Sequence, residues 1–127
     1  MTYSGGRPGD SGPDATSARA DSQPSVDALL DVLADAHRRF LVEFLREQPA
    51  ETCSFAAAID HVVARAERER EEQLDHDDVE LQFYHRHLPK LADAGLLEYD
   101  TRSETIRYRP NERLELLFDG IQELRTD

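Results

Sequence analysis

The large apolar side chains of this chain begin after residue 24, and this limits where a core can form. Residues 1–24 contain no aliphatic side chain larger than alanine except Met1, yet they hold four of the six glycines and three of the six prolines. Such a segment cannot bury enough apolar surface to offset the entropy of folding, so a disordered tail is predicted over 1–24. It has no basic cluster that would make it a DNA-binding arm. The folded domain is expected over 25–127, enough chain for one domain.

The charged residues are strongly unbalanced. The chain has 27 acidic and 15 basic residues and a formal net charge of −12, and Lys90 is its only lysine beside 14 arginines. Carboxylates that repel one another in dilute buffer are screened in concentrated salt, where the Debye length falls to ~3 Å at 1 M. The composition therefore predicts an acidic, halophilic protein. An ordinary acidic protein from a GC-rich genome, which favours arginine codons, is the alternative.

Several classes of protein are not expected from this sequence. The longest apolar run is Phe55 to Ile59, and no apolar stretch follows a basic start at the amino terminus, so neither a membrane span nor a secretory signal is predicted. A single cysteine, Cys53, cannot form an intramolecular disulfide or supply paired zinc ligands. These features favour a cytoplasmic protein.

Apolar residues at helical spacing predict two helices after the tail. The first is expected over 26–47, between Pro24-Ser25 and the helix-breaking Gln48-Pro49-Ala50, and the second is expected to begin near the N-cap candidate Ser54. A strongly charged stretch over 65–78 is expected to form an exposed helical extension and a loop. The apolar positions of the two helices are Val26, Leu29, Leu30, Leu33, Phe40, Leu41, Phe44 and Leu45, then Phe55, Ile59, Val62, Val63 and Ala66.

A third helix is expected from Asp77-Asp78 to Ala94, with Gly95 following its carboxyl end. Pro89 has no N–H for the carbonyl of His85 and is expected to kink or thin this helix. On an ideal helix one face is apolar and the opposite face is polar and basic, with Phe83 at the border. The core face comprises Leu81, Tyr84, Leu88, Leu91, Ala92 and Gly95, and the opposite face Gln82, Arg86, Pro89, Lys90 and Asp93.

A hairpin and a last helix are expected after Gly95. Two short strands, 96–100 and 105–109, flank the polar residues 101–104. Their alternation points Leu97, Tyr99, Ile106 and Tyr108 inward and Arg107 and Arg109 outward, with Arg102 near the tip. Pro110-Asn111 begins the last helix, whose apolar stripe comprises Leu114, Leu117, Phe118, Ile121 and Leu124.

Three helices followed directly by a hairpin is the element order of a winged helix-turn-helix, so the fold class expected is mainly α (α+β) with a two-stranded wing and a C-terminal helix. The chain resembles a winged-helix domain family of salt-loving archaea, of unassigned function and found in presumed transcriptional regulators. The resemblance covers about residues 27–109. It is carried by Leu29 to Leu41 with its central His37-Arg38-Arg39, by His87-Leu88-Pro89-Lys90-Leu91, and by Ala94-Gly95-Leu96-Leu97-Glu98-Tyr99-Asp100.

The resemblance implies a sequence-specific DNA-binding transcriptional regulator. The third helix would enter the major groove and the wing would follow the phosphate backbone, because arginine and lysine suit phosphates and guanine edges and glutamine pairs with adenine. The residues expected to contact DNA are Gln82, Arg86 and Lys90 in the helix and Arg102, Arg107 and Arg109 in the wing. The alternative is a winged-helix protein-interaction module that does not bind DNA, in which carboxylates cancel this positive charge.

Catalysis, cofactors and metals are not expected. No phosphate-binding glycine loop and no nucleophile beside a base is present in the sequence. His85 and His87 diverge by about 200° on a helix and cannot chelate one ion together. The last helix is expected to form a homodimer interface through Leu114, Leu117, Phe118, Ile121 and Leu124, and its alternative is a fourth core helix of a monomer.

Overall fold

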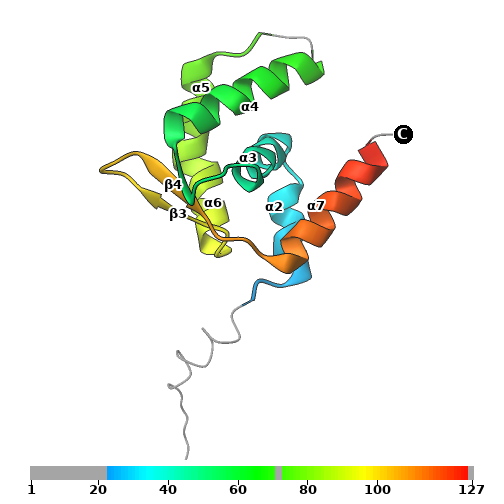
Figure 1. The fold of residues 1–127 in the computed structure, drawn as a ribbon. Helices are drawn as coiled ribbons and strands as arrows, with labels where there is room; N and C mark the ends of the chain where they lie inside the picture. The colour runs from blue at the N-terminus through cyan, green and yellow to red at the C-terminus, as the bar shows by residue number, and fades with distance from the viewer. Residues whose placement is uncertain (1–22, 71–72, 126–127) are drawn as a thin grey trace, which may run out of the picture.

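A computed structural model describes residues 23–70 and 73–125 (Figure 1). The predicted disordered tail lies almost entirely outside these residues. The fold is mainly helical with a small antiparallel sheet, an α+β arrangement. In chain order the elements are α2 (Val26–Leu33), α3 (Ala36–Arg46), β2 (Thr52–Ser54), α4 (Phe55–Arg70), α5 (His76–Gln82), a π-helical turn η1 (Phe83–His87), α6 (Leu88–Asp93), β3 (Leu97–Asp100), β4 (Thr105–Tyr108) and α7 (Glu112–Arg125).

The prediction of a single helix over 26–47 is wrong, because the chain forms two helices there. Helix α2 ends at Leu33, and α3 begins at Ala36 after Asp35, whose backbone is extended. The Asp35 carboxylate accepts hydrogen bonds from the backbone N–H groups of His37 (2.8 Å) and Arg38 (3.2 Å). An aspartate can satisfy the free donors of a helix start in this way, so it separates two helices without a proline or glycine.

The hairpin is confirmed, and a third strand joins it. Strands β3 and β4 pair antiparallel with Leu97 opposite Tyr108 and Tyr99 opposite Ile106. Strand β2 pairs with the other edge of β4, which gives the order β2-β4-β3. The sequence did not predict β2, since a three-residue strand is too short to show alternation and its partner lies some 50 residues further along the chain.

The helix expected from Asp77-Asp78 to Ala94 is confirmed in extent and is formed by α5, η1 and α6, which together are called the third helix below. Its buried face differs from the expected one. The turn Phe83–His87 is π-helical, and the N–H of Leu88 donates to the carbonyl of Phe83. A wider turn just before Pro89 relieves the clash between the proline ring and the carbonyl four residues earlier, that of His85. The extra residue rotates the helix before Pro89, so Phe83 is fully buried in the place expected for Tyr84, and Leu81 is 53% exposed.

One apolar core joins the helices and the sheet. Its largest fully buried side chains include Leu29, Leu41, Phe55, Phe83, Leu96, Ile106, Leu114 and Phe118. In Figure 1 the hairpin lies on one side of the molecule and α2 and α7 on the other, with α3 between them. Gly95 has a φ of +76° and lets the chain turn from α6 into β3. No helix among the described residues has the length and apolarity that a membrane crossing needs.

Candidate nucleic-acid interface

The three helix residues expected to contact DNA lie in consecutive segments of the third helix. Gln82 ends α5, Arg86 lies in η1 and Lys90 lies in α6. Gln82 and Arg86 are exposed. The Lys90 ammonium is 2.5 Å from Asp31 Oδ2 on α2, and this salt bridge holds the pKa of the Asp31 carboxyl below its usual value. Among the described residues, the helix therefore presents an exposed glutamine, an exposed arginine without an ion-pair partner, and one lysine that is already paired.

In the part of the chain that the structure describes, two of the three hairpin arginines are paired with a carboxylate and one is not. Arg102 lies in the turn and is exposed. Arg107 Nη2 is 3.1 Å from Glu51 Oε1, and Arg109 Nη2 is 2.9 Å from Glu98 Oε2. Within residues 23–70 and 73–125, no carboxylate forms an ion pair with Arg86 or Arg102.

A buried arginine fixes the third helix against α2 and α3. Arg38 is only 5% exposed, and its guanidinium donates to the carbonyls of Val32 (Nε, 2.7 Å) and Asp31 (Nη2, 3.1 Å). Its Nη1 is 3.0 Å from His87 Nδ1 in η1. The arginine thus binds two carbonyl groups where α2 ends, of which that of Asp31 also accepts the Ala34 N–H, and it ties that end to the third helix. Sequence reasoning missed this role, because the contact joins residues 49 positions apart.

His87 is a neutral, buried histidine. Arginine can only donate, so His87 Nδ1 accepts and the ring proton lies on Nε2, which is 4.0 Å from Asp35 Oδ1. The pKa of His87 is lowered to about 4, mainly by burial and also by the Arg38 cation, while the Asp35 carboxylate opposes both.

Two groups of described side chains have the composition of metal ligands. One comprises Asp35, His37 and His87, and the other comprises His76, Asp77 and Glu80. In the first, the proton on His87 Nε2 occupies the position that a metal ion would need, and the Arg38 cation lies beside the ring. In the second, His76 Nε2 is within 3.0 Å of Asp60 Oδ1, and the group lies largely on the surface. Both arrangements fit structural hydrogen bonding.

Aromatic side chains hold the hairpin against the third helix. The ring of Phe55, at the start of α4, lies 4.4 Å from Tyr84 in η1 and 5.5 Å from Tyr99 in β3. The two tyrosine rings are 5.7 Å apart. In addition, the Phe55 N–H donates to the carbonyl of Glu104 in the hairpin turn at 2.9 Å. The hairpin and the third helix are therefore held in a fixed relative position.

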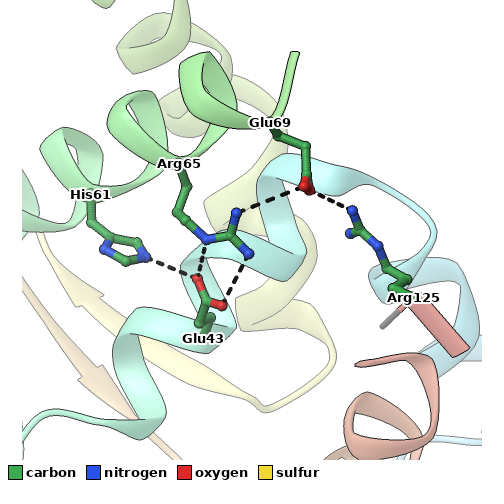
Figure 2. Close-up of polar contacts among 5 residues, drawn as sticks. All are labelled: Glu43, His61, Arg65, Glu69 and Arg125. Carbon is green, nitrogen blue, oxygen red and sulfur yellow. Dashed lines mark hydrogen bonds and ion pairs between the residues drawn. The ribbon is translucent and has the colours of Figure 1, made fainter. Parts of the chain in front are cut away.

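An ion-pair network links α3, α4 and α7 (Figure 2). Glu43 accepts from Arg65 Nε at 2.9 Å and from His61 Nε2 at 3.2 Å, and Glu69 contacts both Arg65 (3.8 Å) and Arg125 (2.5 Å). Burial raises the pKa of Glu43, but the hydrogen bonds from Arg65 and His61 outweigh it and hold that pKa below its usual value. The charged stretch that begins at Arg65 thus packs against α3, where only an exposed extension was expected.

The five residues of α7 that were expected to form a dimer interface differ in how far they are buried. Leu114 and Phe118 are 0% and 2% exposed within the single chain, so the expectation that they form an interface is wrong for these two side chains. They face inward because α7 packs on α2. Leu117 and Ile121 are partly buried, and Leu124 is 77% exposed. Leu116 of α7 is also exposed, and it is not part of the apolar stripe expected from the sequence.

Comparison with known proteins gives a family match. A family model described as a domain of unknown function, DUF7344, matches residues 30–107, from within α2 to within β4. No curated protein and no solved structure is detectably similar to the chain.

Proposed function

The chain belongs to the DUF7344 family of domains of unknown function, and from that premise we propose that it is a winged helix-turn-helix DNA-binding regulator of a salt-loving organism. The observation that carries the proposal is the arrangement of its elements. Helices α2 and α3, strand β2, helix α4 and the third helix precede the hairpin in that order, and β2 pairs with β4 in the sheet order β2-β4-β3. In a winged helix this arrangement sets a helix and a hairpin side by side, where both can meet one duplex.

The exposed residues support a division of roles. Gln82 and Arg86 lie on the third helix, where glutamine and arginine can read base edges in a major groove. Arg102 lies at the hairpin turn, where it suits a phosphate contact. Lys90, Arg107 and Arg109 would exchange their carboxylate partners for phosphates on binding.

Binding to sheared genomic DNA at about 0.2 M and about 2 M KCl, followed by sequencing of the retained fragments, tests the proposal. We expect a common motif among the retained fragments. Arg86→Ala should weaken binding about tenfold or more, as expected for the loss of one base contact. The control Arg68→Ala removes the same charge from an exposed position on α4 and should bind like the wild type. A folded protein that retains nothing at either salt concentration would exclude this function.

A protein-interaction module is the second candidate, and a specific observation favours it. Lys90, Arg107 and Arg109 are each paired with a carboxylate, which reduces the positive charge that a DNA-binding surface needs. The same binding experiment separates the candidates, because a module of this kind would retain no DNA although it is folded.

We also propose that the protein acts as a homodimer, with a contact surface different from the one expected. The exposed apolar side chains Leu116 and Leu124 on α7, and Val26 and Leu30 on α2, would replace the buried Leu114 and Phe118. Sedimentation equilibrium of the wild type and of Leu116→Glu/Leu124→Glu tests this, with a monomeric wild type as the contradicting result.

A further inference from the structure

Three of the five basic residues proposed to contact DNA carry a carboxylate partner from a neighbouring segment. Asp31 of α2 pairs with Lys90, Glu51 before β2 pairs with Arg107, and Glu98 of β3 pairs with Arg109, at distances of 2.5, 3.1 and 2.9 Å. The partners come from three different parts of the chain. Each pair therefore places a negative charge directly beside a proposed phosphate contact.

These pairs are not structural locks. The Asp31, Glu51 and Glu98 side chains are 60%, 75% and 56% exposed, and ion pairs of this exposure contribute little to stability. Water and dissolved ions reach all three carboxylates. The pairs can open, and their effect on stability does not account for the repeated placement of a carboxylate beside a basic residue.

The effect on DNA binding is larger than the effect on stability. When a basic side chain neutralises a phosphate, a cation condensed on the DNA is released, and this release makes the affinity fall as salt rises. A carboxylate next to that basic side chain then lies close to the phosphate as well. Two neighbouring negative charges hold a cation from solution, so one cation is taken up for the one released.

We propose that Asp31, Glu51 and Glu98 offset cation release with cation uptake, and so preserve DNA affinity in concentrated salt. This inference rests on the proposed DNA-binding function. Four uncompensated phosphate contacts, at Lys90, Arg102, Arg107 and Arg109, predict that log K falls with log salt with a slope of about −3.6. With three of these contacts compensated, only Arg102 releases a cation without replacement, and the slope becomes about −0.9.

The test is the salt dependence of binding to one duplex, measured by fluorescence anisotropy from about 0.1 to 1 M KCl. The variant Asp31→Asn/Glu51→Gln/Glu98→Gln keeps the shapes of the side chains and removes three negative charges. We expect it to bind more tightly than the wild type at low salt and to have a slope near about −3.6. The advantage over the wild type should shrink by about 500-fold over this tenfold rise in salt.

A matched control separates local uptake from net charge. Asp27→Asn/Glu47→Gln/Glu112→Gln removes the same three charges from exposed positions on α2, the end of α3 and α7. It should keep the slope of the wild type. An equal change of slope in both variants, or a wild-type slope already at about −3.6, would overturn the inference while leaving DNA binding intact. Absence of binding by all folded variants would overturn the proposed function itself.

Discussion

A single residue in the hairpin turn holds a strained backbone. Glu104 has a φ of 54°, and its carbonyl accepts the N–H of Phe55 at the start of α4. Left-handed geometry is costly for a residue with a Cβ and free for glycine. Glu104→Gly should therefore raise the free energy of unfolding by about 0.5–1 kcal/mol relative to Glu104→Ala, after the greater flexibility of glycine in the unfolded chain is subtracted. Urea unfolding measures the difference, and a less stable glycine variant would contradict the role of strain.

A second residue makes stability depend on pH. The pKa of His87 is about 4 in the folded protein and 6.5 in its ordinary state, so the folded state favours the neutral ring. The stabilisation is fully present above pH 6.5 and is lost as the pH falls toward 4. We expect a loss of about 3 kcal/mol over this range in urea unfolding.

Two variants identify the source of that pH dependence. His87→Gln keeps an acceptor for Arg38 and should lose most of the change between about pH 6.5 and about pH 4.5, above the range where most carboxylates titrate. His85→Gln, at an exposed position in the same turn, should retain it. Equal pH profiles for the wild type and His87→Gln would show that the buried ring is not responsible.

Among the elements, the boundary between α2 and α3 depends on one side chain. Asp35→Ala removes the acceptor of two backbone N–H groups and should destabilise the protein by about 1 kcal/mol at neutral pH. Asp35→Asn keeps an oxygen in the same place and should be close to the wild type. Thermal unfolding compares the two. A full loss in the asparagine variant would assign the effect to charge.

The sequence predicts the order of the elements well, because long apolar periodicities and the alternating hairpin residues are local signals. It predicts neither the break at Asp35 nor the π turn before Pro89, since apolar spacing continues through both. Strand β2, the Arg38–His87 contact and the Glu43–Arg65 ion pair depend on residues distant in the chain. The same holds for the candidate interface. Its basic residues could be predicted from the sequence, but their carboxylate partners could not.

At the scale of the whole molecule, the net charge of −12 leads us to expect that salt stabilises the fold. Raising KCl from about 0.1 to about 1 M shortens the Debye length from ~10 to ~3 Å and screens the long-range repulsion between carboxylates. The ion pairs among the described residues span 4.0 Å or less, so salt weakens their attraction less than it weakens the long-range repulsion. Urea unfolding should therefore show a higher free energy of unfolding at the higher salt.

The charge-matched variant Asp27→Asn/Glu47→Gln/Glu112→Gln provides the control. It is three units less negative, so its gain from KCl should be smaller than that of the wild type. A wild type whose stability is unchanged or lower in 1 M KCl would show that attractive pairs, and not net repulsion, dominate the electrostatics of the fold.

The packing of α2 against α7 also has a consequence in time. About 80 residues separate the end of α2 from the start of α7. At ribosomal rates of about 5–20 residues per second, α2 waits roughly 4 to 16 s for α7 to be synthesised. Until then α2 can contact α3 and the third helix, but not α7. The core is therefore complete only after α7 has been synthesised and packs on α2.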